Sequence, residues 1–197
     1  GAYDVRITAE LWETHFFDHV SLQVVDHPAG TEVFIDERFS ASRPPSFAIR
    51  TFAAPEPVSA AWDDRGRDVA GDVMARDGRY LASFDRGAYQ GIAAQHFVEL
   101  AVPSDAVRRR LTLIAQGWVY PTDSSINVAI GQGSAVRPSG MALEASGPDG
   151  AWRVVDPDIG FPAGKDKTML IDLSGIGQAT RVRLRTNLEV YWDWLAL

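Results

Sequence analysis

The second half of the chain is divided into short segments by clusters of turn-forming residues. Segments that can form strands follow one another at intervals of about 8 to 12 residues, with almost no helical periodicity between them. This spacing is typical of a β-sandwich or jelly roll. The predicted strands are residues 95–101, 111–120, 125–131, 141–145, 151–154, 167–172, 181–185 and 188–195.

The acidic residues support the same fold class. Of 26 acidic residues, 18 are Asp and 8 are Glu, and the chain also has 17 Gly and 11 Pro. Asp, Gly and Pro favour turns, whereas Glu favours helices. Most of the aspartates lie between predicted strands, so the acidity follows from a turn-rich β architecture.

The first half contains fewer predicted strands and one predicted helix. Residues 5–11 alternate between apolar and polar side chains, which predicts a strand. Residues 20–24 and 33–35 are predicted to form a hairpin across the loop 26–30. A further strand over 58–62 and a short helix over 69–75 follow.

We therefore expect an all-β protein made of a jelly-roll β-sandwich with a smaller β-rich N-terminal portion packed against it. The sandwich should comprise residues 91–197 and the smaller portion residues 1–90. The Asp- and Gly-containing stretch between residues 77 and 91 gives the boundary.

Charge and composition exclude several classes of partner. The net charge of -7 and the pI near 5.0 argue against nucleic acid. The chain has no cysteine, which excludes disulfides and thiolate sites. No stretch approaches the roughly 18 consecutive apolar residues of a membrane span, so we expect no membrane insertion.

No catalytic motif stands out. The stretch 131–135 resembles a nucleophile elbow only in its glycines, and no helical pattern follows it. We therefore expect a non-catalytic protein without a cofactor. The N-terminal residues 1–4 lack an initiator Met and a signal sequence, so we expect an excised domain with any targeting signal upstream.

A carbohydrate site is predicted where the strand 111–120 ends. Trp118 and Tyr120 lead directly into a polar loop that carries Asp123 and Asn127. Sugar rings stack on aromatic faces, while their hydroxyls bond to carboxylates and amides. The alternative is that Trp118 belongs to the core and that Asp123 caps the turn.

A metal site is the second candidate. His15, His19 and Asp26, with Asp18 and His27 close by, could hold a divalent ion across the predicted hairpin. The alternative is that these histidines pack or cap turns. The Asp-rich turn 63–68 suggests calcium, but its two arginines favour a turn that neutralises its own charge.

Two further patterns concern the C-terminal strands. Arg181, Arg183 and Arg185 project from one strand face, where they could bind an anion or pair with Glu189 and Asp193. The alternating apolar residues of the last strand, Leu188, Val190, Trp192 and Trp194, are predicted to close the core, or else to form an exposed stacking platform.

The residues 160–165, 169–173 and 181–193 carry a family resemblance. This part of the chain resembles the C-terminal β-domain of bacterial proteins with tetratricopeptide repeats, or with FG-GAP repeats and an ASPIC/UnbV segment. Its end is similar to galactose-binding-like (discoidin-type) jelly rolls. The resemblance implies a module of a larger bacterial protein in an extracytoplasmic location, with carbohydrate or the parent chain's own repeats as partners.

Three functions thus remain open at this point. The first is a non-catalytic binding module for carbohydrate. The second is a structural docking domain without a small ligand. The third is a hydrolase or metal-dependent enzyme that would use carboxylates at the rim of the sandwich or the histidines of the first hairpin.

Overall fold

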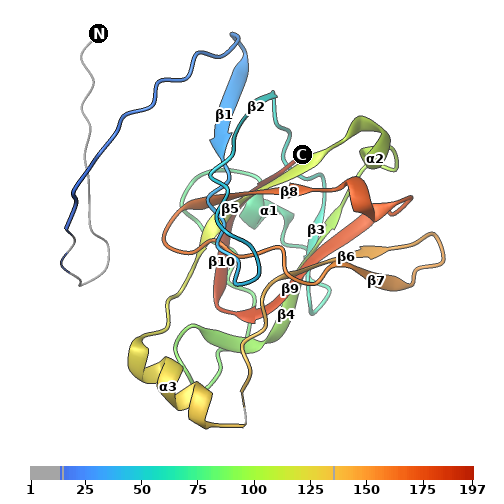
Figure 1. The fold of residues 1–197 in the computed structure, drawn as a ribbon. Coiled ribbons are helices and arrows are strands. Elements are labelled where there is room, and N and C mark those ends of the chain that lie inside the picture. The colour runs from blue at the N-terminus through green and yellow to red at the C-terminus, as the bar shows by residue number, and fades with distance from the viewer. Residues whose placement is uncertain (1–13, 15, 135) are drawn as a thin grey trace.

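The computed structural model describes residue 14, residues 16–134 and residues 136–197, with the side chains of 107 and 108 excepted. Strands dominate it, and the all-β prediction is confirmed at that level (Figure 1). The strands are β1 (Thr31–Ile35), β2 (Ile49–Ala53), β3 (Ala61–Asp63), β4 (Ile92–Ala101), β5 (Thr112–Val119), β6 (Ala142–Ser146), β7 (Trp152–Asp156), β8 (Lys167–Asp172), β9 (Arg181–Leu188) and β10 (Val190–Ala196). The helices are α1 (Ala70–Val73), α2 (Ala106–Arg109), α3 (Ser124–Gln132) and a 3-10 turn (Ser174–Ile176).

Two antiparallel sheets form the body of the molecule. One has five strands in the order β3-β4-β9-β6-β7, and the other has three in the order β10-β5-β8. Alternate side chains from both sheets meet in one apolar core, which contains Leu100, Leu143, Leu184, Leu113 and Leu195. Burying such side chains stabilises the fold by about 1.5–3 kcal/mol each. The chain is therefore a β-sandwich.

A separate hairpin covers the outer face of the three-stranded sheet. β1 pairs only with β2 among the described strands. Phe34 of β1 packs against Ile114, Leu170 and Trp194, and Phe52 of β2 lies against the same cluster. This apolar contact holds the hairpin of β1 and β2 against the three-stranded sheet.

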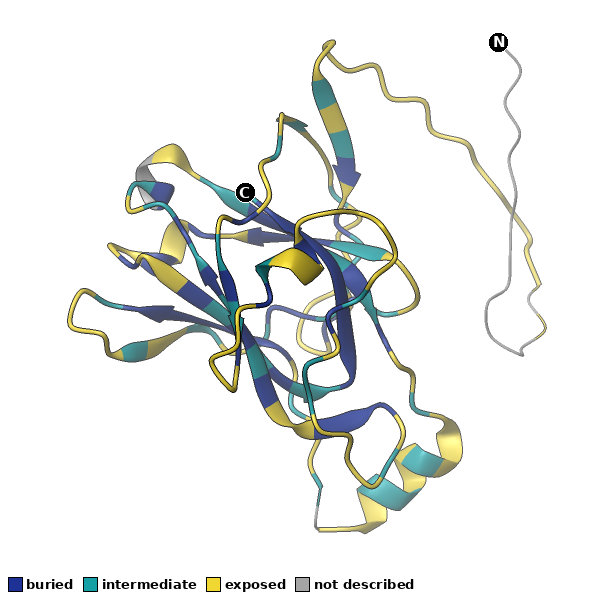
Figure 2. Cartoon of the chain, turned by 180° about the vertical axis from the view of Figure 1, so that it is seen from behind, coloured by how far each residue is buried: buried dark blue, intermediate teal, exposed yellow. Residues whose placement is uncertain are grey.

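The predicted first hairpin is wrong in its partner. Residues 31–35 do form a strand, but they pair with 49–53 and not with 20–24. Pairing with β2 buries Phe34 and Phe52 together, which the segment 20–24 does not achieve. That segment runs away from the sheets and is exposed along its length (Figures 1 and 2). The predicted strand 5–11 lies outside the described residues.

The predicted strand 125–131 is also wrong, because the segment forms α3. Asp123 caps the helix, since its side chain accepts a hydrogen bond from the backbone N–H of Ile126 at 2.8 Å. The other predicted strands of the second half correspond to β4 to β10, and the predicted short helix corresponds to α1.

The division at residue 90 stays a prediction. The five-stranded sheet takes β3 from the first portion and its other strands from the second. Leu81 of the first portion also bonds to Trp192 of β10 through both backbone groups.

Candidate functional site

Four aromatic side chains, Tyr80, Trp118, Tyr120 and Tyr191, form a cluster that we call the aromatic rim. Trp118 of β5 lies directly opposite Tyr191 of β10, and the two rings stack with centroids 4.5 Å apart and planes at 11°. Tyr120 is 5.7 Å and Tyr80 is 6.1 Å from the Trp118 ring. Contacts of this kind each contribute about 0.5–1.5 kcal/mol beyond simple burial.

The strands behind the rim fix its position. Gly117, next to Trp118, allows β5 to approach β10 closely, because a Cβ at this position would overlap the carbonyl oxygen of Tyr191. Beyond the end of β5, the backbone N–H of Tyr120 donates to the carbonyl of Glu189 at 2.9 Å. Gln90 also donates to the carbonyl of Pro121 at 2.8 Å. Tyr120 is thus held from both sides although it lies outside a strand.

Exposure divides the rim into two parts. Tyr191 is buried and Trp118 is half-buried, whereas Tyr120 is 39% exposed. The Trp118 Nε1 atom is buried, and it has no hydrogen-bond partner among the described residues. Tyr120 is therefore the accessible ring of the rim, and Trp118 lies behind it. The carbohydrate site predicted at Trp118 and Tyr120 stays a prediction.

Charged groups border the aromatic rim. The exposed Arg86 donates to the hydroxyl of Tyr191 at 3.2 Å and lies 3.8 Å from the buried carboxylate of Glu189. The hydroxyl of Tyr80 donates to Asp166 at 2.5 Å. This bond, together with partial burial, raises the pKa of Tyr80 to about 12. Tyr80 therefore stays a hydrogen-bond donor to a higher pH than an ordinary tyrosine.

The other two predicted ligand residues lie together at the start of α3. Asp123 Oδ1 accepts from the hydroxyl of Ser125 and the N–H of Ile126, and these bonds lower the pKa of Asp123. Asn127 Oδ1 accepts a hydrogen bond from the Thr122 hydroxyl. The amide N–H groups of Asn127 have no acceptor among the described residues. Asp123 thus has the capping role that was the alternative prediction.

The predicted metal ligands are not brought together in the described part of the chain. His19 and Asp26 are exposed on the extended segment before β1, and His15 lies outside the described residues. Among residues 14, 16–134 and 136–197, no group of three or more potential ligands is close enough to hold a metal ion. His27 lies within hydrogen-bond distance of the Thr31 hydroxyl at 3.1 Å, which matches the turn-capping alternative.

The arginine row forms ion pairs, but the partners differ from those predicted. Arg181 bonds to Glu99 of β4, and Arg183 and Arg185 both bond to Glu144 of β6. Sheet order decides this, because β9 lies between β4 and β6 and not beside β10. The three guanidinium groups are therefore paired with carboxylates of their own sheet.

The Asp63 turn neutralises its own charge, as the alternative to calcium binding predicts. The buried carboxylate of Asp63 accepts from the backbone N–H groups of Arg65 and Arg67, from Arg67 Nε and from the Ser83 hydroxyl. Burial alone would raise the pKa of Asp63, but these bonds outweigh it and lower the pKa to about 2. The carboxylate has a structural role.

Sequence reasoning did not associate Tyr80, Arg86, Glu189 or Tyr191 with Trp118 and Tyr120. The alternation of the last strand does place Glu189 and Tyr191 on the face opposite Val190 and Trp192. The sequence carries no signal for the pairing of β5 with β10, which brings Tyr191 under Trp118. Tyr80 reaches the rim from a connection without regular structure.

Comparisons with known proteins give no relative for this chain: no family model, no curated protein and no solved structure matches it. Within the described residues, no helix is long and apolar enough to span a membrane.

Proposed function

We propose that this chain is a non-catalytic binding module that holds a carbohydrate at the aromatic rim. The architecture proposed for it is a galactose-binding-like jelly roll. Antiparallel sheets of five and three strands packed face to face support that proposal, and so does the position of the rim at one end of β5. The module would serve a larger extracytoplasmic bacterial protein.

The observation that carries the proposal is an exposed ring on a rigid aromatic base. Tyr120 is 39% exposed, and the Trp118–Tyr191 stack lies directly behind it. Stacking on such a ring costs little conformational entropy, because the ring is already fixed. Arg86 lies close to Tyr120, and the Asn127 amide follows in the segment after it, so both offer donors for sugar hydroxyls.

Retention on a panel of immobilised polysaccharides tests this proposal. Tyr120→Ala should abolish the retention of the wild-type chain, whereas Tyr120→Phe should keep most of it because the stacking face remains. Phe47→Ala serves as the matched control, since it removes another exposed ring from the connection between β1 and β2. Failure of the wild-type chain to bind any glycan would refute the proposal.

The extended segment before β1 favours a second candidate, a docking domain. Residues 16–25 expose Phe16, Val20, Leu22 and Val24, although the alternation suits a strand with one buried face. We call residues 16–25 the arm. Its turn into β1 is formed, because the N–H of Thr31 donates to the carbonyl of Pro28. The outer edge of β1 has no paired strand among those described.

In this second candidate the docking partner is a second copy of this chain and not the repeats of a parent chain: the arm of one copy adds as a strand to the β1 edge of the other. Sedimentation velocity over a range of concentrations tests it. The wild-type chain should dimerise, and the triple substitution Val20→Ser, Leu22→Ser and Val24→Ser should leave a monomer with an unchanged fold. A wild-type chain that stays monomeric at all concentrations would exclude this function.

A further inference from the structure

A cavity in the described part of the chain lies far from the aromatic rim. It has a volume of about 560 Å³, which falls within the range of small-molecule sites. Thr112 at the start of β5 lines it, whereas Trp118 near the end of β5 belongs to the rim. Six residues of strand separate the two positions by about 20 Å. The cavity and the rim are therefore separate features.

Backbone hydrogen bonds hold the walls of this cavity. The segment that follows β2 is fixed to the end of β10, because Glu56 and Leu197 exchange both backbone hydrogen bonds at 3.0 and 2.8 Å. The N–H of Leu111 donates to Ala106, and the N–H of Val102 donates to Thr180. The cavity is thus built by segments of fixed geometry, as preformed ligand sites are.

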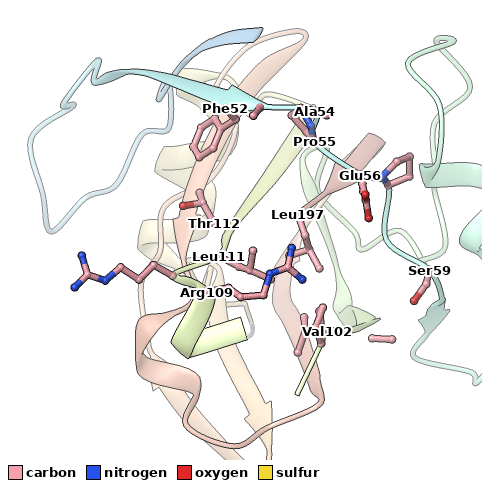
Figure 3. Close-up of a pocket in the computed structure, with 15 residues that line it drawn as sticks. Phe52, Ala54, Pro55, Glu56, Ser59, Val102, Arg109, Leu111, Thr112 and Leu197 are labelled. Atoms are coloured by element: carbon pink, nitrogen blue, oxygen red, sulfur yellow. The ribbon is translucent and has the colours of Figure 1, made fainter. Parts of the chain in front are cut away.

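The lining combines an apolar surface with two guanidinium groups. Figure 3 shows Phe52, Pro55 and Glu56 along one side of the cavity, with Arg109 and Val102 on the other. Arg110 also lines it, and Glu56 is the only carboxylate side chain among the described lining residues. Two guanidinium groups and one carboxylate side chain therefore line the cavity, together with the C-terminal residue Leu197.

Arg109 and Arg110 are less closely paired with carboxylates than the arginines of β9 are. Arg109 approaches Asp105 only at 4.0 Å. Arg110 has no ion pair or hydrogen bond to another described residue, whereas Arg183 and Arg185 are both bonded to Glu144. Guanidinium groups bind carboxylates and phosphates through two parallel hydrogen bonds, so available ones next to an apolar surface select an organic anion.

The backbone at the cavity is held in an unusual conformation. Arg110 has φ of 53° and Ala54 has φ of 44°, and both line the cavity. Residues other than glycine rarely adopt these angles, because the left-handed region costs them about 1–2 kcal/mol. Such residues concentrate at ligand sites, where the surrounding structure holds them.

We propose that this cavity is a second binding site, for a small organic anion that places a carboxylate or phosphate at Arg109 and Arg110 and an apolar body against Phe52, Val102 and Leu111. The site adds to the carbohydrate function and does not depend on it, because the rim and the cavity share no residue.

Ligand-observed NMR with three matched probes tests the proposal on the wild-type chain: 4-phenylbutyrate, phenyl phosphate and the neutral 4-phenylbutanol. At least one anion should bind about tenfold more tightly than the alcohol. The preferred anion distinguishes a carboxylate site from a phosphate site. Equal binding of the alcohol and both anions, or no binding of any probe, would overturn the proposal.

Variants assign the binding to this cavity. Arg109→Gln with Arg110→Gln should weaken the anion about tenfold and leave the alcohol unchanged. Arg43→Gln with Arg79→Gln removes the same charge from exposed positions elsewhere and should change little. Ser59→Phe adds a ring to the cavity lining without changing charge and should also abolish binding. Unchanged anion affinity in both cavity variants would contradict the assignment.

Discussion

Replacing Asp63 with Asn removes the most extensively bonded carboxylate among the described residues. Asp63 is 2% exposed, and it accepts four hydrogen bonds, two from backbone N–H groups and two from side chains. An Asn side chain presents an NH₂ group to some of these donors, so their bonds are lost while their burial remains. We expect the free energy of unfolding at pH 7 to fall substantially.

The size of the effect follows from the pKa of Asp63. A decrease from the ordinary value of 3.8 to about 2 corresponds to about 2.4 kcal/mol of stability. Because the folded pKa is the lower one, this contribution is complete well above pH 3.8 and is lost as the pH falls towards 2. By pH 3 about 1 kcal/mol of it should be gone.

Urea unfolding followed by tryptophan fluorescence at pH 7, 5 and 3 measures this. Asp63→Asn should be less stable than the wild-type chain by about 2.4 kcal/mol at pH 7, and the difference should shrink by about 1 kcal/mol at pH 3. Asp64→Asn, which removes the same charge from the neighbouring exposed position, should be close to wild type. A difference that does not change with pH would refute the reasoning.

Three other substitutions test the two sheets and the cap of α3. Glu144→Gln should lower the unfolding free energy by about 2 kcal/mol in urea, because two arginines lose a buried partner. Gly117→Ala should lower it by about 3 kcal/mol, since the added Cβ meets the Tyr191 carbonyl and forces β5 and β10 apart. Asp123→Ala should destabilise the first turn of α3 by about 1 kcal/mol, because the cap bond to the Ile126 N–H is lost. Amide hydrogen exchange should then become faster over residues 124–132, while β5 stays protected.

Period and turn chemistry predicted the sandwich strands well, because each of these strands has one face in the core. β9 is the simplest case, since Val182 and Leu184 are buried, whereas the alternating Arg181, Arg183 and Arg185 are not. The pattern of apolar residues did not distinguish α3 from a strand. Its apolar residues Ile126, Val128 and Ile130 alternate as in a strand, and the cap at Asp123 decided the outcome.

The candidate sites were only partly predictable, because they depend on which strands become neighbours. Trp118 and Tyr120 were found from composition and from their position at the end of a strand. The ring that supports them, Tyr191, comes from the pairing of β5 with β10, which no local pattern encodes. The bulge between Trp192 and Trp194 likewise sends these two rings to opposite faces of β10, against the alternation predicted for this strand.

The most direct test of the carbohydrate proposal is an NMR titration of the ¹⁵N-labelled wild-type chain with the glycan that retains it. The backbone amide of Tyr120 and the indole N–H of Trp118, the latter resolved from the other five tryptophans, should shift with a common affinity. Signals from the arm and from Arg109 and Arg110 should stay in place. Binding of the glycan with both rim signals unmoved would contradict the account.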